Sequence, residues 1–238
     1  MSWTDLIAVE NILKLKKQFH INTAIATGTY RGFDTELYAN YFEYVYSMDI
    51  SQEYLDIAQE RLKGYDNITL CQMSSWEFIK LFRQAYEIMH SNDTVFIYLD
   101  AHFYDPSFSP QDKWVAVKEL QALKGFKNCV LCIHDFDCED LGHLIYGGEH
   151  FGWNVIGKYI TAVNPNFCYY INTREYTNIC DRDSISQLPI QFDKYLEDSL
   201  NYVHSSDEKK YRGILYAVPQ PLDLAKYRLK KYDQTRAY

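Results

Sequence analysis

Acidic and imidazole side chains stand directly after two apolar segments that the residue pattern predicts as buried strands. Five of these side chains have the chemistry of an active site: Asp100, His102, His134, Asp135 and Asp137. The carboxyl ends of parallel strands meet along one edge of a sheet, where such sheets bind their ligands. The sequence therefore predicts an acid-rich active site at this edge.

A second group of residues lies in the turn Ala26-Thr27-Gly28-Thr29-Tyr30-Arg31-Gly32. This turn leaves an apolar run and opens a helix-like segment, an arrangement that lets backbone approach a ligand closely. About twenty residues beyond its start, the next strand-like run ends in Asp49, where an acid can bind ribose hydroxyls. The order of strand, glycine turn, helix, strand and acid indicates a nucleotide-binding half-sheet.

The elements that must position these residues alternate between strand and helix. Strands are expected at 23–26, 44–48, 68–72, 94–99 and 129–133, and helices at about 3–19, 33–42, 52–62, 74–90, 112–123 and 154–163. Short connections and continuous apolar strands are typical of an open parallel sheet with helices on both faces. We expect an α/β fold with a Rossmann-like, doubly wound, mostly parallel seven-stranded sheet.

The last third of the chain is less regular. Two further strands are expected at 167–172 and 213–218, with a polar insertion between them, and a loop is expected at the glycines of 142–152. The tail at 223–238 is expected to be a solvated basic helix, or else a docking segment for a second subunit of a homo-oligomer. Without a linker, residues 1–238 form one expected domain, with its core at about 3–173 and the insertion, last strand and tail at 174–238.

The composition argues against several classes of function. The formal net charge of −8 disfavours a broad nucleic-acid-binding face, which needs clustered lysine and arginine. No apolar run approaches the roughly 20 residues that span a bilayer, and no signal peptide is apparent. Cys129 and Cys132 form a CxxC inside a strand, where alternation sends them to opposite faces. We therefore expect a cytoplasmic protein with reduced cysteines that binds neither nucleic acid nor membrane.

The order of these motifs resembles that of the class I S-adenosylmethionine-dependent methyltransferases. The nearest branch contains macrocin-type sugar O-methyltransferases, cephalosporin-hydroxylase-like proteins and catechol O-methyltransferase-like enzymes. The resemblance covers residues 3–173 and rests on four motifs at predicted strand ends, at 27–32, 47–49, 96–102 and 132–135. It implies a Rossmann-like fold, S-adenosylmethionine as cofactor and a small-molecule acceptor.

The resemblance also implies a cofactor site along the first strands. Gly28 and Gly32 match the turn beneath the methionine part of the cofactor, where Thr29 and Tyr30 would offer backbone N–H groups. Asp49 matches the acid that binds both ribose hydroxyls, unless it caps the helix that follows. Adenine contacts follow the third strand in this family, and a tryptophan there would stack on the purine or join the core. The full implied set is Thr27, Gly28, Thr29, Tyr30, Gly32, Asp49, Ser74, Ser75, Trp76 and Asp100.

In the metal-dependent members, acids at the ends of the fourth and fifth strands hold a divalent cation. Asp100 and Asp135 match these places, and Asp137 or His134 would supply a third ligand, so that the implied metal set is Asp100, Asp135 and Asp137. The cation, Mg²⁺ or Mn²⁺, would bind neighbouring hydroxyls of the acceptor and lower the pKa of one. The oxygen would then attack the methyl group in line. The expected function is metal-assisted O-methylation of a small-molecule or sugar hydroxyl.

A histidine near these acids is the expected general base, because an imidazole titrates near the working pH. His102 is the first choice, so that the catalytic set is His102, His134 and Asp135. His143 and His150 lie in the glycine-rich loop and would enter the site if that loop closes as a lid.

The chain departs from the family pattern in two places. Ala26 stands where an acid usually opens the glycine motif, and Gln72, Ser74 and Ser75 stand where an acid often follows the third strand. Asp100 would then take over the contact to the cofactor's ammonium group. These departures leave open a catalytically inactive Rossmann-like binding module.

The glycine turn and the residues after the fourth strand also bear on the choice of cofactor and acceptor. A nicotinamide enzyme is disfavoured because the turn has two glycines rather than the three of the dinucleotide fingerprint. A methyltransferase acting on another acceptor class, such as a nucleic-acid base, stays open. The residues Asp100-Ala101-His102-Phe103 replace the Asn/Asp-Pro-Pro-aromatic motif of amino-group methylation, which favours an oxygen acceptor.

Overall fold

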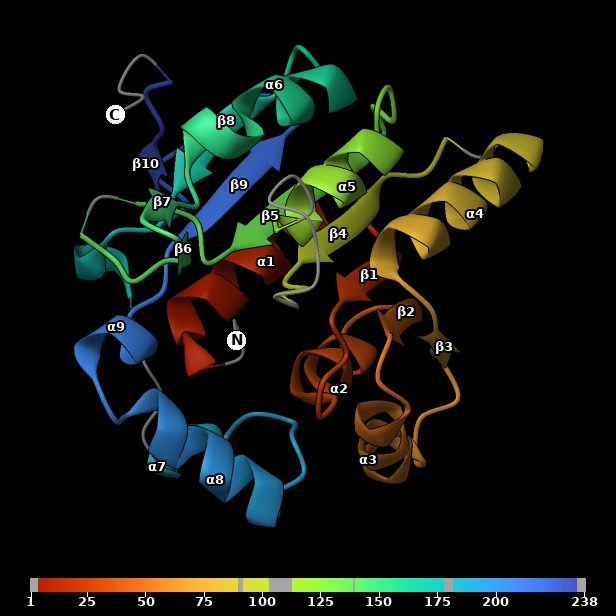
Figure 1. Ribbon diagram of the computed structural model, residues 1–238, viewed down its shortest axis with the longest axis vertical. Coiled ribbons are helices and arrows are strands. Elements are labelled where there is room, and N and C mark those ends of the chain that lie inside the picture. Colours follow the sequence, from red (N-terminus) through yellow and green to blue (C-terminus); the bar gives the residue numbers. More distant parts are fainter. Residues whose placement is uncertain (1–3, 90–91, 103–112, 139, 178–181, 235–238) are drawn as a thin grey trace.

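The computed structural model describes residues 4–89, 92–102, 113–138, 140–177 and 182–234. Its main sheet has eight strands in the order β10-β8-β9-β5-β4-β1-β2-β3 (Figure 1). The strands are β1 Thr23–Thr27, β2 Tyr44–Asp49, β3 Ile68–Gln72, β4 Val95–Leu99, β5 Cys129–His134, β8 Cys168–Ile171, β9 Ile214–Val218 and β10 Lys230–Lys231. The first five pair in parallel, whereas β9 is antiparallel to both β5 and β8.

The sheet is doubly wound about β1 and β4. Beyond β1 the chain adds β2 and β3, and beyond β4 it adds β5 on the opposite side. Ligands of such sheets bind at this switch point, outside the carboxyl ends of the strands. The expected Rossmann-like, mostly parallel sheet is therefore confirmed. The expected number of seven strands is exceeded by β10, which pairs antiparallel with β8 through two residues.

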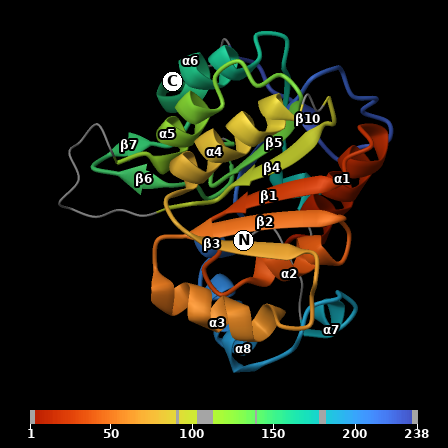
Figure 2. The same ribbon diagram turned by 90° about the vertical axis from the view of Figure 1, so that its right-hand side faces the viewer.

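Helices cover both faces of the sheet. They are α1 Leu6–Gln18, α2 Phe33–Ala39, α3 Gln52–Leu62, α4 Ser75–Ile88, α5 Val115–Ala122 and α6 Trp153–Val163, followed in the insertion by η2 Arg174–Tyr176, α7 Arg182–Ile185, α8 Lys194–Val203 and α9 Asp207–Lys210. Figure 2 shows α4, α5 and α6 on one side of the strands, and α2 and α3 on the other.

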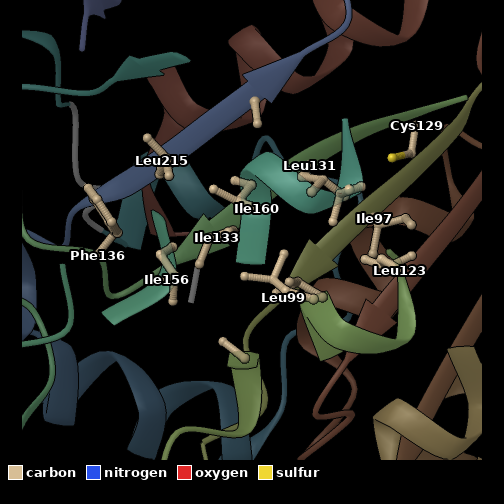
Figure 3. Packing of buried hydrophobic residues seen from close by; sticks show 14 of the residues in the cluster. Ile97, Leu99, Leu123, Cys129, Leu131, Ile133, Phe136, Ile156, Ile160 and Leu215 are labelled. Atoms are coloured by element: carbon tan, nitrogen blue, oxygen red, sulfur yellow. The ribbon is translucent and has the colours of Figure 1, made fainter. Parts of the chain in front are cut away.

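The strands are buried on both faces because alternate residues enter two separate hydrophobic clusters. Ala24 of β1 and Cys132 of β5 belong to the cluster beneath α1 and α2. Ile25 and Cys129, from the same strands, belong to the cluster beneath α4, α5 and α6. Figure 3 shows this second cluster, in which Ile97 and Leu99 of β4, Leu131 and Ile133 of β5, and Ile156 and Ile160 of α6 come together. The opposite placement of the two CxxC cysteines is confirmed, and both thiols are free.

Some expected boundaries are wrong. The first helix begins at Leu6, because the Asp5 side chain caps it by accepting from Ile7 N at 3.0 Å. The glycine-rich loop contains a hairpin of β6 Ile145–Tyr146 and β7 Glu149–His150. The described part of the tail, 223–234, contains turns and β10 in place of the expected basic helix.

A buried ion-pair network fixes the insertion against the core. The Arg61 guanidinium in α3 lies 2.9 Å from the Glu36 carboxylate in α2 and also contacts Asp193, which caps α8. Arg61 further donates to the Gln191 carbonyl at 2.9 Å. These contacts fasten the start of α8 to α2 and α3, and the Arg31 guanidinium of the glycine turn lies 5.0 Å from the Tyr195 ring centroid in α8. Among the described residues, no helix combines the length and apolar character needed to cross a membrane.

Candidate active site

A cavity of about 930 Å³ opens at the carboxyl ends of the parallel strands. Five successive strand ends contribute to its wall, together with the β6–β7 hairpin, α8 and the segment before β9. The lining includes Gly28 to Arg31, Met48 to Ile50, Met73 to Trp76, Asp100 to His102, His134, Asp135, His143 to Ile145, Asp198, Ser199, Tyr202 and Arg212. The cavity therefore brings together the glycine turn and the acid–histidine residues that the sequence singles out.

The glycine turn presses directly against the end of β4. Gly28 has a φ of +74°, and a Cβ there would lie 3.0 Å from Ala101 Cα and 3.0 Å from the Asp100 carbonyl oxygen. The Thr27 hydroxyl oxygen accepts from the N–H groups of Asp100 at 3.1 Å and Ala101 at 3.3 Å. Thr27 is buried and joins β1 to β4, whereas Gly28 lines the cavity. The turn thus fixes Asp100 relative to the first strand.

The N–H groups after Gly28 are used inside the protein. Thr29 N donates to the Met48 carbonyl at 3.1 Å, and Tyr30 N donates to Asp49 Oδ2 at 2.9 Å. In this structure they are therefore not offered to a ligand, contrary to the expectation from sequence. The bonds instead join the turn to the end of β2. Gly32, with a φ of +82°, opens α2 and packs against Ala58 of α3 rather than lining the cavity.

Asp49 lies at the cavity wall with both carboxylate oxygens fixed. Oδ2 accepts from Tyr30 N, and Oδ1 accepts from Ser51 N at 2.9 Å. Ser51, not Asp49, caps α3, because its side chain accepts from Tyr54 N. Each carboxylate oxygen keeps a further lone pair. Asp49 is therefore held in place and can still accept hydrogen bonds from two hydroxyls.

The residues after β3 form the adjoining wall. Ser74 occupies the N-cap position of α4, and its hydroxyl donates to the Glu77 carboxylate. Ser75 is buried, whereas Trp76 is half-buried, with the Lys118 ammonium 4.7 Å from its ring centroid. All three residues from 74 to 76 line the cavity. Residues 74–76 thus line the cavity where the resemblance implies adenine contacts, with the Ser74 hydroxyl bonded to Glu77 and the Ser75 hydroxyl oxygen buried.

Two carboxylates and two imidazoles alternate at the ends of β4 and β5. His102 Nε2 lies 3.0 Å from Asp100 Oδ1 and 3.1 Å from Asp135 Oδ2. His134 Nδ1 lies 3.1 Å from Asp100 Oδ1 and 3.0 Å from Asp135 Oδ1. Asp135 has a φ of +60°, a conformation uncommon for a residue with a side chain and often associated with functional sites. The structure therefore assembles the predicted catalytic set His102, His134 and Asp135 around Asp100.

The charges of this cluster stabilise one another. Burial alone would lower the pKa of His102, but the carboxylates of Asp100 and Asp135 outweigh it and raise this pKa to about 9. Burial likewise opposes, but does not prevent, the rise in the pKa of His134 caused by the same acids. Burial would raise the pKa values of Asp100 and Asp135, yet the histidines hold both well below the usual range. In the metal-free protein His102 is therefore an imidazolium at neutral pH, and Asp100 and Asp135 are carboxylates.

The cluster also has the donor set of a divalent-cation site. One ligand atom from each of Asp100, His102, His134 and Asp135 lies within 4.8 Å of the others. His102 Nε2 is buried between two carboxylate oxygens, yet has no well-aligned hydrogen bond among the described residues. Oxygen and imidazole ligands suit Mg²⁺ or Mn²⁺. These residues therefore fit a divalent cation.

Asp137 does not belong to this cluster. Its N–H donates to the Phe151 carbonyl at 2.8 Å, which places Asp137 beside β7. There it groups with His143 and His150, and not with Asp100 and Asp135. The structure therefore places His102 and His134, and not Asp137, beside Asp100 and Asp135, so the expected third ligand Asp137 lies in a different group.

Two charged residues, Arg212 in the cavity wall and Glu119 buried behind it, were not predicted from the sequence. Arg212, immediately before Gly213 and β9, donates from Nε to Asp135 Oδ1. Glu119 of α5 is fully buried, and burial raises its pKa to about 7, although Ser75 and Thr27 hydroxyls and the His102 charge lower it in part. Neither Glu119 oxygen has a well-aligned hydrogen bond among the described residues. In the sequence, Arg212 shows only as a charged residue just before an apolar strand, and Glu119 only as a charged residue in an apolar helix. Neither position by itself indicates a functional role.

No family model matches the chain, and no curated protein matches it. Solved structures with similar architecture include an rRNA methylase from Streptococcus thermophilus, which is 10% identical over 87% of this chain and 92% of that chain, with a TM-score of 0.45. The N-methyltransferase NodS from Bradyrhizobium japonicum WM9 is 12% identical over 89% and 94%, with a TM-score of 0.45. A SAM-dependent methyltransferase from Anabaena variabilis ATCC 29413 is 14% identical over 88% and 83%, with a TM-score of 0.43. The chemistry of the present site must be argued from its own residues.

Proposed function

We propose that this protein is an S-adenosylmethionine-dependent methyltransferase that methylates a hydroxyl of a small molecule with the help of Mg²⁺ or Mn²⁺. The observation that carries the proposal is that one cavity is lined by two groups of residues. We call the glycine turn, Asp49 and Trp76 the nucleotide-type wall, and the four residues Asp100, His102, His134 and Asp135 the acid–histidine cluster. The glycine turn, Asp49 and Trp76 line one part of this cavity, and Asp100 and Asp135 line the adjoining part. The two parts therefore face the same space.

The nucleotide-type wall supports the cofactor. Asp49 is held by two backbone N–H groups and keeps free lone pairs for the ribose hydroxyls. Trp76 lines the same cavity, and Gly28 keeps the β1 turn in contact with the end of β4. Bound there, S-adenosylmethionine supplies an electrophilic methyl group. The cavity volume of about 930 Å³ lies near the upper end of the roughly 300–1,000 Å³ usual for small-molecule sites, which leaves room for an acceptor.

The acid–histidine cluster supports the cation. Asp100, His102, His134 and Asp135 would hold it, and a bound cation lowers the pKa of a coordinated hydroxyl. Metal-bound imidazoles are neutral, so the additional proton of His102 must leave when the ion enters. A pKa of about 9 leaves His102 protonated in the metal-free protein at neutral pH, so it cannot accept a proton there as a general base. We therefore assign His102 to holding the cation.

Other residues of the chain position and shield the acceptor. Arg212 bonds to Asp135 and fixes the direction of that carboxylate. Ser199 and Tyr202 of α8 line the cavity from the insertion, which the Arg61 ion pairs fasten to the core. Aligning the acceptor oxygen with the methyl group is the main contribution such a site makes to the rate. A diol or catechol-type acceptor, with two oxygens for the cation, fits this arrangement best.

The test is methyl transfer from labelled S-adenosylmethionine to a panel of sugars, catechols, amines and nucleobases, with Mg²⁺, with Mn²⁺ and with a chelator. The proposal expects labelled methyl ether on a vicinal diol, lost with the chelator and restored by the metal. Turnover that survives the chelator would contradict the role of the cation. Cofactor binding without transfer to any hydroxyl, but with transfer to an amine or a base, would contradict the acceptor class.

A further inference from the structure

We propose that Asp137, His143 and His150 form a second cation site, specific for a divalent transition metal such as Zn²⁺, which fastens the β6–β7 hairpin to the segment after β5. This site is separate from the cluster around Asp100 and does not depend on the proposed methyl transfer. Its three side chains come from three short segments, and one ligand atom of each lies within 4.8 Å of the other two.

Backbone hydrogen bonds bring the three segments together. Asp137 N donates to the Phe151 carbonyl at 2.8 Å, and Phe151 N donates to the Leu144 carbonyl at 2.9 Å. In the hairpin, Ile145 pairs with His150. The tight turn at 147–148 uses two glycines with φ values of +58° and +80°, as two-residue hairpins favour. The side chains therefore meet because the local fold holds their backbones in register.

The distances are close to those around a single ion. His143 Nε2 and His150 Nδ1 are 2.7 Å apart, and Asp137 Oδ2 lies 4.0 Å from His150 Nδ1. Two nitrogens that each lie about 2.0–2.1 Å from a tetrahedral cation are separated by about 3.3 Å. Asp137 Oδ1 also lies 3.6 Å from His143 Nδ1, so side-chain rotations are needed to bring the carboxylate and the two imidazoles onto one ion.

A second observation concerns the tautomer of His143. Its Nδ1 lies 3.1 Å from the Leu141 carbonyl oxygen, so Nδ1 carries the hydrogen and donates it. The lone pair of His143 is then on Nε2, which faces His150. Metal-binding histidines almost always donate their other ring N–H to a carbonyl or carboxylate in this way. A neutral His143 with this tautomer accepts from His150 Nδ1, and a cation would take the place of that hydrogen.

The donor set determines which metals fit. Two imidazole nitrogens and one carboxylate suit Zn²⁺ and its neighbours in the first transition row, whereas Mg²⁺ prefers oxygen ligands alone. The His150 side chain is 53% exposed, so an ion can enter from solvent. The His143 side chain is 13% exposed and lines the main cavity beside Leu144 and Ile145. A bound ion would therefore stiffen the wall that the hairpin forms.

The test is Zn²⁺ titration against a chromophoric chelator, which counts bound equivalents and gives their affinity. We compare wild type with His150→Gln, with His143→Gln/His150→Gln, and with His204→Gln, which changes an exposed imidazole next to α8. Because loss of an outer-shell partner alone lowers metal affinity about 10–100-fold, removing two ligands is expected to weaken one Zn²⁺ equivalent by at least about 100-fold. His204→Gln is expected to bind as wild type does.

A second readout is the melting temperature with and without Zn²⁺. Wild type and His204→Gln are expected to gain stability with Zn²⁺, and the double variant is expected to lose the part of that gain due to the hairpin site. The proposal is overturned if wild type binds no Zn²⁺, or if the double variant binds the same number of equivalents with the same affinity. His150→Gln changes the most exposed ligand, so it serves if the double variant does not fold.

Discussion

The backbone of Gly28 touches the backbone of Ala101, since a Cβ at residue 28 would lie only 3.0 Å from Ala101 Cα. This contact joins the nucleotide-type turn after β1 to the segment that carries Asp100 and His102. The two parts of the proposed site are therefore in direct backbone contact. A change in one is expected to displace the other.

Gly28→Ala is expected to lower both stability and cofactor affinity. The left-handed backbone at φ +74° costs a residue with a Cβ about 1–2 kcal/mol, and the contact with β4 adds to it. Gly125→Ala is the matched control, because its φ is +81° but nothing lies within 4 Å of a Cβ there. Denaturant unfolding should show a larger loss for Gly28→Ala than for Gly125→Ala. Equal losses would mean that the close approach is unimportant.

Glu119 gives a prediction for the dependence of stability on pH. Its pKa is raised from 4.5 to about 7 by burial, so the folded state holds this proton more tightly than the unfolded state does. The stabilisation is fully present below pH 4.5 and is lost as the pH rises through about 7. At about 1.4 kcal/mol per pKa unit, the loss amounts to about 3 kcal/mol.

Glu119→Gln should remove this loss, so that the variant gains stability relative to wild type between pH 5 and pH 8. The measurement is urea unfolding at a series of pH values. Glu53→Gln, which changes an exposed carboxylate on α3, should follow the wild-type curve. Parallel curves for wild type and Glu119→Gln would show that Glu119 is ionised in both states.

The two groups of acids and histidines make opposite predictions for two neighbouring aspartates. Asp135→Asn should weaken Mn²⁺ binding at the Asp100 cluster by at least about 100-fold, because it removes a ligand. Asp137→Asn should leave that binding unchanged, since Asp137 groups with His143 and His150. Calorimetric titration with Mn²⁺ distinguishes them. Equal losses in both variants would support the metal set expected from sequence.

Arg61 tests how the insertion is held over the cavity. Arg61→Ala leaves Glu36 buried without its main partner, and breaking a buried pair in this way costs about 3–5 kcal/mol. Lys63→Ala removes an exposed pair with Glu60 at the end of the same helix and should cost no more than about 1 kcal/mol. Urea unfolding measures both. Similar small losses would mean that α8 is fastened by other contacts.

The sequence was sufficient to predict the parallel strands of the sheet, because the signals for them are local. Each of the parallel strands is a short apolar run, and glycine or capping residues mark where the helices between them begin. Ser51 and Gly32 mark two such boundaries. The same runs placed Asp49, Asp100 and Asp135 at one edge, as the structure has them.

The features that the sequence did not predict depend on contacts between segments far apart in the chain or on very short strands. Arg212 meets Asp135 across 77 residues, and nothing local indicates that pairing. The β6–β7 hairpin and β10 have two residues per strand, too few to show an alternating pattern. Asp137 stands two residues after Asp135, yet a turn at φ +60° and a bond to Phe151 carry it into another cluster.

The central claim is that this cavity binds S-adenosylmethionine through Asp49. Calorimetric titration of wild type with S-adenosylmethionine and S-adenosylhomocysteine, with and without Mg²⁺, tests it most directly. Asp49→Asn should weaken binding by at least about tenfold, since a hydrogen bond to a charged group contributes about 1.5–3 kcal/mol. Asp56→Asn, an exposed acid on α3, should bind as wild type does. Micromolar binding with this pattern is the predicted result. No binding of either compound in either condition would contradict it and would identify the chain as a fold that has lost its cofactor.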